Sequence, residues 1–232
     1  MKLHYDSYQY SNYLTLVLRV VNNNHVNYCY VVIDQYSNDA ILVDPAWEMV
    51  TINKVLLAND VSLKGILVTH HHLDHIDLSS VMSLEHDVPV YMSREEVDFY
   101  KVKMDKLTTF DGGELLELGG VRIKPIFTPG HTKGSTCYFV GDSLFTGDTL
   151  FIETCGFCLD KGASSYDMYN SLTFLKRVVP RRARVFPGHS YSAKPGERFS
   201  NVLDINPYLN MDNVEEFVRF RDNTKKKWLQ SI

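Results

Sequence analysis

A dense cluster of metal-ligand side chains occupies residues 69–75, which read Thr-His-His-His-Leu-Asp-His. The segment follows the apolar run 65–68, which is typical of a short buried strand. Its spacing, H-x-H-x-D-H, offers four ligand-type residues, namely His70, His72, Asp74 and His75. Neutral imidazole and carboxylate groups suit zinc and related borderline ions. A polar loop with chance histidines is the alternative, but imidazoles this close together would repel one another if protonated, so the spacing favours a metal site.

Three further donors come later in the chain, each just after a predicted strand. His131 and His189 each follow a Pro-Gly turn, and Asp148 follows an apolar strand end. Donors in these positions lie at the edge of a sheet rather than in its core. Together with the first four they make seven donors, which is enough for two metal ions that share one carboxylate.

This set of donors resembles the metallo-β-lactamase superfamily and, within it, the glyoxalase II-like hydrolases. All seven ligand positions of that family are filled here. The resemblance implies that His70, His72 and His131 hold one metal ion. It also implies that Asp74, His75 and His189 hold the other, and that Asp148 bridges the two. The implied cofactor is two zinc ions per chain, although iron or manganese would also suit the donors. The implied fold is an α/β fold, the αββα sandwich, in which two facing mixed β-sheets have helices outside.

Two metals about 3.5–4 Å apart can share one hydroxide and polarise a carbonyl, and a metal can lower the pKa of bound water from roughly 15.7 to roughly 7. A serine or cysteine nucleophile is then not required. We expect Asp74 to act as the catalytic residue that accepts a hydrogen bond from the attacking hydroxide and orients it. We expect the side chain of His71 to point away from the pocket. In the glyoxalase II-like enzymes the substrate is a thioester.

The thiol carrier is a separate question, because the segment after Cys155 and Gly156 departs from many relatives. They carry an arginine where this chain has Phe157, and a basic residue there helps to hold the carboxylate of glutathione. A phenyl ring cannot form that charge-assisted bond. Lys161 is a possible replacement, although an exposed lysine is usually only solvated. The chain after His189 is also too short for the full glutathione-binding helical domain.

Residues 153–160 resemble the zinc hydrolases found with bacterial polyketide synthases, which act on acyl groups carried by acyl carrier proteins. We therefore expect an acyl-thioester substrate, with an acyl carrier protein as the leading partner. The basic runs 181–184 and 225–227 could meet an acidic carrier. The simpler interpretation, which we favour for each run, is a solvated surface.

Four other functions remain open. The glutathione thioesterase is one, and a persulfide dioxygenase of the same superfamily, with a single iron held by two histidines and one aspartate, is another. Lactone or phosphodiester hydrolysis on the same site is a third. A carrier-binding module without activity is the fourth, but the intact ligand set argues against it.

The composition describes an ordinary globular chain, with 232 residues, 44% hydrophobic and 22% charged. This length predicts one domain over residues 1–232. A net charge of −4 argues against nucleic-acid binding through a basic field. No apolar run approaches the roughly 20 residues that span a bilayer, so no membrane partner is expected. The N-terminus lacks the apolar region of a secretory signal, which predicts a cytoplasmic protein.

The four cysteines predict no disulfide framework in that compartment. Cys29 and Cys137 lie in apolar strand patterns and are expected in the core. Cys155 and Cys158 form a CxxC pair, for which redox chemistry or another zinc is possible. A second CxxC to complete a zinc site is absent from the sequence, so a structural role is favoured.

The elements that must position the donors follow from periodicity and turn residues. Strands are predicted at 14–21, 27–33, 40–43, 65–68, 89–92, 114–118, 121–127, 135–140, 143–145 and 184–186. Helices are predicted at 48–58, 79–85, from residue 93 onwards, at 166–178 and at 212–228. Each half of the chain therefore runs strands and then a helix, which agrees with two packed sheets with helices outside.

Some single residues carry further expectations. Val50 is placed on the core face of the first helix, and Ser79 is a plausible N-cap. Ser93 and Glu96 form a capping box. Asp44 at a strand end either supports the metal loop, by fold analogy, or is a turn residue before proline. Asp77 stands where relatives commonly have glycine, so the exit of the metal loop is expected to differ.

Overall fold

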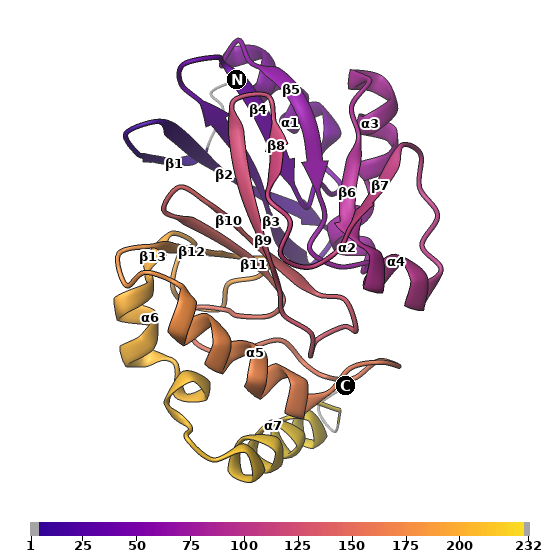
Figure 1. Ribbon diagram of the computed structural model, residues 1–232. Coiled ribbons are helices and arrows are strands. Elements are labelled where there is room, and N and C mark those ends of the chain that lie inside the picture. Colours follow the sequence, from indigo (N-terminus) through magenta and orange to yellow (C-terminus); the bar gives the residue numbers. More distant parts are fainter. Residues whose placement is uncertain (1–4, 230–232) are drawn as a thin grey trace.

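The computed structural model describes residues 5–229, with side chains as far as Asn223. Its strands form two sheets that face each other (Figure 1). The first contains β1 (Asp6–Gln9), β2 (Tyr13–Asn22), β3 (His25–Asp34), β4 (Asp39–Val43), β5 (Ser62–Leu67), β6 (Val90–Ser93) and β7 (Leu107–Phe110), in that order. Pairing is antiparallel from β1 to β4 and parallel from β4 to β7, so this sheet is mixed.

The second sheet is mixed as well and has the order β13-β12-β11-β10-β9-β8. Its strands are β8 (Leu116–Leu118), β9 (Val121–Phe127), β10 (Thr136–Val140), β11 (Ser143–Gly147), β12 (Arg184–Pro187) and β13 (Glu197–Arg198). Only the β11–β12 pair is parallel among these strands. Because a parallel pair needs a long crossover, residues 148–183 leave the sheet and return through a helix.

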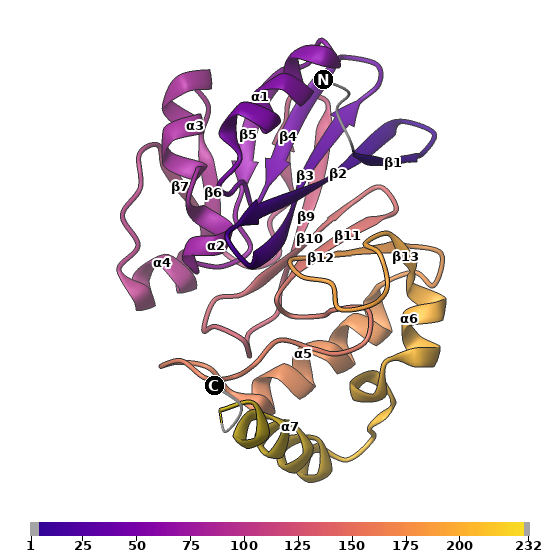
Figure 2. The ribbon, with the colours of Figure 1, turned by 180° about the vertical axis from the view of Figure 1, so that it is seen from behind.

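Helices cover the outer face of each sheet, as Figures 1 and 2 show from opposite sides. Beside the first sheet lie α1 (Met49–Ala58), α2 (Leu73–Ile76), α3 (Ser79–His86) and α4 (Arg94–Tyr100). Beside the second lie α5 (Ser165–Val178), α6 (Phe199–Ile205), the 3-10 helix η1 (Pro207–Asn210) and α7 (Val214–Leu229). The predicted αββα sandwich is confirmed. No helix within residues 5–229 combines the length and apolarity needed to cross a membrane.

Strand alternation explains why the core has layers. In β4, Ala40 and Leu42 face the helices while Ile41 and Val43 face the other sheet, and all four are buried. A strand buried on both faces is apolar throughout, as its sequence is. Between the sheets, the ring centroid of Tyr30 lies 5.2 Å from that of Phe145.

Most predicted elements are present with shifted ends, but two details were wrong. Val50 points to solvent with 67% of its surface exposed, because α1 buries Ile52, Val55 and Leu56 instead. Ser79 is the first residue of α3 rather than its N-cap, and the cap position belongs to Leu78. The Ser93 half of the capping box is confirmed, since its side chain accepts a hydrogen bond from the Glu96 amide.

Candidate metal centre

The strand ends bring all seven predicted donors together at one edge of the sandwich. The metal loop follows β5, His131 lies on the loop after β9, and Asp148 and His189 follow β11 and β12. The two sheets are joined here by a backbone hydrogen bond from the Thr136 amide to the Thr69 carbonyl (3.0 Å). Gly188 keeps the space open, because a Cβ there would lie 2.4 Å from Oδ1 of Asp148.

Three imidazoles form the first donor group. Nε2 of His70 lies 3.1 Å from Nδ1 of His72, and Nε2 of His131 lies 3.0 Å from the same Nδ1. His70 and His131 are buried, and His72 is half-buried. Their inward nitrogens are close enough to bind one ion together, which is the grouping that the resemblance implies.

The second group consists of Asp74, His75 and His189. Oδ2 of Asp74 lies 3.8 Å from Nε2 of His75 and 3.5 Å from Nε2 of His189. Asp148 stands between the groups. Its Oδ1 lies 3.4 Å from Nε2 of His75, and its Oδ2 lies 3.6 Å from Nε2 of His131 and 3.3 Å from Nε2 of His189. This carboxylate therefore faces donors of both groups, which is the position of a bridging ligand.

Each of the five imidazoles has an acceptor at the ring nitrogen that points away from the centre. The pairs are Nδ1 of His70 with Oγ1 of Thr69 (3.0 Å), Nε2 of His72 with Oδ2 of Asp160 (3.0 Å), Nδ1 of His75 with Oδ2 of Asp44 (2.9 Å), Nδ1 of His131 with the carbonyl of Phe157 (2.6 Å) and Nδ1 of His189 with the carbonyl of Val26 (3.1 Å). An N–H donated outward leaves the lone pair of the other nitrogen pointing inward. Such an arrangement suits neutral imidazoles that bind a cation.

Two buried atoms support a cation at the centre. Nε2 of His75 and Oδ1 of Asp148 lack a hydrogen-bond partner among the described residues, although only 3.4 Å separates them. Buried polar atoms are rarely left unpaired. A metal ion between nitrogen and carboxylate donors would satisfy both atoms, so these residues fit zinc, and iron or manganese as well.

The two groups differ in their electrostatics. Burial and the neighbouring imidazoles lower the pKa of His72 to about 4 and hold the pKa of His70 well below its usual range. Burial also opposes charge on His189, but the carboxylates of Asp148 and Asp74 outweigh it and raise the pKa of His189 to about 11. Despite burial, the surrounding histidines hold the pKa of Asp148 well below its usual range. The first group is therefore neutral at neutral pH, whereas the second holds a proton on His189 beside two carboxylates, a proton that a bound cation would replace.

Supporting residues hold the metal loop from both sides. Asp44 accepts hydrogen bonds from the amide (2.8 Å) and the hydroxyl (2.7 Å) of Thr69 and from His75, which confirms its supporting role. The side-chain amide of Asn27 (Nδ2) donates to the backbone carbonyl (2.6 Å) and to Oδ2 (3.1 Å) of Asp74. Sequence reasoning missed Asn27, for which the only signal was a polar residue within an apolar strand.

His71 points away from the centre, as predicted. Its ring stacks on Tyr100, with 3.7 Å between the ring centroids, and its Nδ1 lies 2.7 Å from Oε1 of Glu96. At the loop exit, Asp77 accepts a hydrogen bond from the amide of Trp47 (3.3 Å). Neither residue faces the donors.

The cysteines are structural in this geometry. All four are buried, and no disulfide joins them. Burial raises the pKa of Cys137 and of Cys155 to about 12, so both thiols stay protonated at neutral pH and are poor nucleophiles.

Phe157 contacts the centre through its backbone carbonyl, and a cation that the sequence did not predict lies over its ring. The guanidinium carbon of Arg221, on α7, lies 4.1 Å from the centroid of the Phe157 ring. Arg221 is buried, donates to the Tyr208 hydroxyl (3.0 Å), and leaves Nε and Nη2 without partners among the described residues. Lys161, the replacement considered from sequence, lies over Phe99 instead, 5.8 Å from the ring centroid.

The model of the metallo-beta-lactamase superfamily matches residues 23–189, which contain all seven donors. The chain belongs to this superfamily. Its hydrolase relatives and its own donor set make it a hydrolase of the metallo-β-lactamase type.

The chain is similar to superfamily members of different named activities, among them two relatives and one solved structure. The probable polyketide biosynthesis zinc-dependent hydrolase BaeB of Bacillus velezensis is 42% identical over 203 residues, covering 88% of this chain and 90% of that protein. The hydroxyacylglutathione hydrolase of Dictyostelium discoideum is 30% identical over 214 residues, covering 88% and 75%. The crystal structure of ETHE1 from Myxococcus xanthus superposes with a TM-score of 0.79 at 25% identity, covering 90% of each chain. The predicted resemblance, including its polyketide subgroup, is confirmed.

Proposed function

We propose that this metallo-β-lactamase chain hydrolyses thioesters at a centre of two metal ions, most suitably zinc. The observation that carries the proposal is the position of Asp148, whose two oxygens lie 3.3–3.6 Å from nitrogens of both donor groups. Two such ions would supply an activated water and polarise the acyl carbonyl. Zinc is favoured because relatives at 42% and 38% identity are named zinc-dependent.

The protein's own contribution is to orient that water and its proton. Oδ2 of Asp74 accepts from the Asn27 amide, so this carboxylate is held with its oxygens toward the centre. Burial opposes its charge, but His189, His75 and Asn27 keep the pKa of Asp74 well below its usual range. It stays ionised at neutral pH and can accept a hydrogen bond from the attacking water, which is the catalytic role predicted for it.

We further propose that the acyl group arrives on an acyl carrier protein. The relative of highest identity given above is named for polyketide biosynthesis. Phe157 presents a half-buried ring beside the centre, and a ring of this kind suits the largely neutral pantetheine arm of a carrier better than the carboxylates of glutathione. One face of the ring is covered by Arg221, so the phenyl position is held firmly by a cation–π contact.

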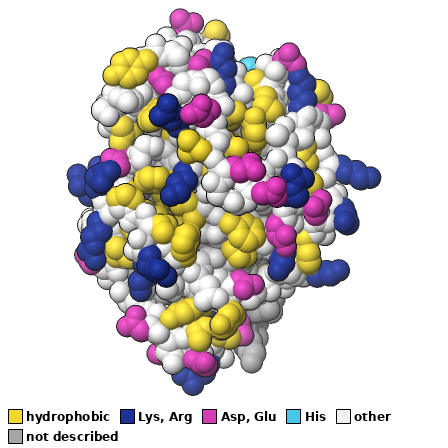
Figure 3. Space-filling model, viewed as in Figure 1, with side chains coloured by type: hydrophobic (Ala, Val, Ile, Leu, Met, Phe, Trp, Pro, Cys, Tyr) yellow, Lys and Arg dark blue, Asp and Glu magenta, His cyan; other side chains and the backbone are white. Residues whose placement is uncertain are grey.

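The basic runs give the carrier proposal little support. Nε of Arg182 lies 3.0 Å from a carboxylate oxygen of Asp142, and Nη1 of Arg184 donates to the carbonyl of Gly196. The side chains of residues 225–227 lie outside the described residues. Figure 3 shows lysines and arginines interspersed with acidic side chains over the face it displays. The partner and the predicted cytoplasmic location stay predictions.

Glutathione is the second candidate carrier, and Arg221 is the observation that favours it. This buried guanidinium places a positive charge against the ring of Phe157, next to the position where relatives have arginine. The relatives named hydroxyacylglutathione hydrolase point the same way.

One comparison tests both carriers. Zinc-loaded protein is given an acylated carrier protein and an acylated glutathione at equal concentration, and release of free thiol is followed. Preference for the carrier protein supports the proposal. Preference for glutathione overturns the carrier assignment but keeps the thioesterase. Hydrolysis of neither overturns the thioesterase, and oxygen consumption by iron-loaded protein with a persulfide would then test the dioxygenase.

A further inference from the structure

Glu96 is a fully buried carboxylate whose contacts divide evenly between two loops. Its Oε1 accepts from the amide (3.0 Å) and Nδ1 (2.7 Å) of His71. Its Oε2 accepts from the hydroxyl of Thr132 (2.9 Å) and the amide of Gly134 (2.6 Å). Both oxygens are therefore saturated by donors, two from the metal loop and two from the loop that carries His131.

The capping of α4 does not explain this carboxylate. In a capping box the glutamate would return to the amide of the N-cap residue, but all four contacts of Glu96 go elsewhere. The Ser93 hydroxyl accepts from the Glu96 amide (3.2 Å) and also reaches the carbonyl of Gly134 (2.7 Å). Burying a carboxylate costs free energy unless it is fully hydrogen-bonded, so the network must be complete for the site to fold as observed.

The residues that Glu96 holds are neighbours of predicted ligands. His71 stands between His70 and His72, and Thr132 directly follows His131. These three ligands make up the first donor group, and they come from the two loops that Glu96 joins. The loop of His131 also packs closely on α4, because a Cβ on Gly134 would lie 2.2 Å from the Glu96 amide nitrogen.

The second donor group has its own supports. His75 is held by Asp44, Asp74 by Asn27, and His189 by the Val26 carbonyl. None of these contacts passes through Glu96. A change at Glu96 should therefore alter the spacing of the first group and leave the second in place.

We propose that Glu96 is a positioning residue that sets the distance between the two loops and so the affinity of the first metal position. The inference rests on the metal centre of the proposed function, not on its substrate. Partners that orient metal ligands typically contribute about 10–100-fold to metal affinity. We expect a loss of this size at one metal position only.

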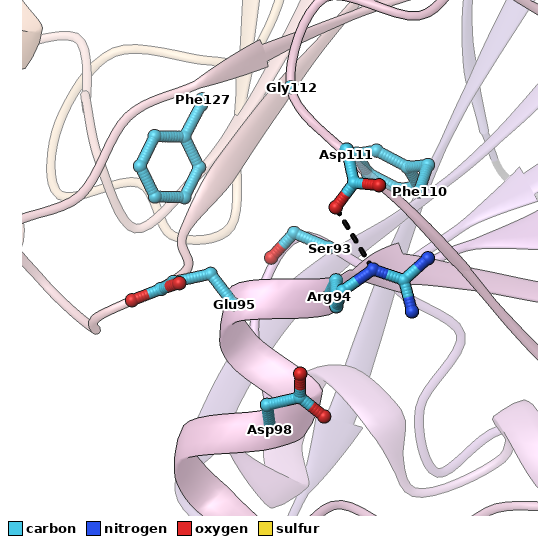
Figure 4. A pocket seen from close by; sticks show the side chains of 8 residues that line it. All are labelled: Ser93, Arg94, Glu95, Asp98, Phe110, Asp111, Gly112 and Phe127. Atoms are coloured by element: carbon cyan, nitrogen blue, oxygen red, sulfur yellow. Dashed lines mark hydrogen bonds and ion pairs between the residues drawn. The ribbon is translucent and has the colours of Figure 1, made fainter.

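The variant Glu96→Gln tests this, because a glutamine amide accepts on one side only and turns its NH₂ toward donors on the other. Glu95→Gln is the matched control. Glu95 lies on the same helix and is exposed, and its one ion pair among the described residues is a 4.0 Å contact with Lys133. It lines a surface pocket of about 240 Å³ with Ser93 and Arg94, as Figure 4 shows.

The measurement is a competition titration of metal-free protein with Co²⁺ and a chelator, read by visible absorption. Wild type and Glu95→Gln should show two binding steps. Glu96→Gln should weaken one step about 10–100-fold and leave the other unchanged. His131→Ala, which removes a donor of the first group alone, identifies that step. The Glu96→Asp variant keeps the charge but is too short to reach both loops, so it should show the same loss.

Unchanged steps in Glu96→Gln, equal weakening of both, or full affinity in Glu96→Asp would overturn the inference. Failure of wild type to bind metal would instead overturn the metal centre itself. If Glu96→Gln does not fold, Thr132→Val replaces it, because this change of similar shape removes the hydroxyl that links Glu96 to the His131 loop, together with the 2.6 Å contact of that hydroxyl with Ser135. It should weaken the same step, and an unchanged step would count against Glu96.

Discussion

Nδ1 of His131 donates a hydrogen bond to the backbone carbonyl of Phe157 at 2.6 Å. A predicted ligand of the metal centre is thus tied to the residue at which this chain differs from many glyoxalase II-like relatives. Because the acceptor is a backbone atom, the side chain at position 157 can change without removing the support of His131. A change of the Phe157 side chain should therefore leave metal binding intact.

Replacing Phe157 by arginine should shift the carrier preference toward glutathione while metal content stays unchanged. The new guanidinium would lie close to that of Arg221, so repulsion should limit the effect of the single variant. Phe157→Arg combined with Arg221→Met should lower the KM for acyl-glutathione further than Phe157→Arg alone. Steady-state kinetics with both thioesters checks this. The control is Phe174→Arg on the exposed face of α5, and an equal response there would contradict the role of position 157.

Asp148→Ala should lose metal and nearly all hydrolysis while the protein stays folded. The carboxylate faces donors of both groups, so its removal takes a ligand from each metal position and reduces the negative charge that attracts cations. Metal analysis after dialysis, circular dichroism and thioester hydrolysis check the three parts. Asp204→Ala, at an exposed position on α6, is the control. Wild-type metal content and rate in Asp148→Ala would rule out the bridging assignment.

Asp160→Asn should weaken the first metal position by about 10-fold, the low end of the range for an orienting partner. The carboxylate of Asp160 lies 3.0 Å from Nε2 of His72, but it is 58% exposed and water can replace part of its effect. Chelator competition measures the change. Asp98→Asn, also exposed and outside the centre, should have no effect. A loss confined to the second metal position would contradict the pairing of Asp160 with His72.

Metal binding should release protons mainly from the second donor group. Without a cation the pKa of His189 is raised to about 11, so this imidazole is protonated at neutral pH and must lose its proton to bind metal. The pKa of His72 in the first group is lowered to about 4, so this imidazole is already unprotonated at neutral pH and releases almost no proton when metal binds. Metal affinity should therefore rise with pH between 6 and 9 at the second position. Titration calorimetry in buffers of different ionisation enthalpy counts the protons, and buffer-independent heats would disprove this.

Many features of this protein could be predicted from local sequence. The spacing of His70, His72, Asp74 and His75 after an apolar strand predicts the metal loop, because the period of a strand and the turn that ends it depend only on near neighbours. Periodicity likewise predicts α5 with Met168, Leu172 and Leu175 inward. The predictions for Val50 and Ser79 were wrong, because which helix face is buried and which residue caps a helix depend on the packing around them.

Only the tertiary structure decided which groups form hydrogen bonds with each predicted ligand and so hold it in place. Asp44 reaches His75 across 31 positions of the sequence, and Glu96 joins loops that lie 25 and 36 positions away from it. Glu96 shows the limit of local prediction most clearly. Its capping pattern is present in the sequence, but its carboxylate accepts hydrogen bonds from His71 and Thr132 instead of from the helix cap. Arg221 is also far from Phe157 in the sequence and covers its ring only in the folded structure. Local pattern determines which residues can bind metal, whereas the pairing of strands and the docking of helices determine which distant side chains complete their hydrogen bonds.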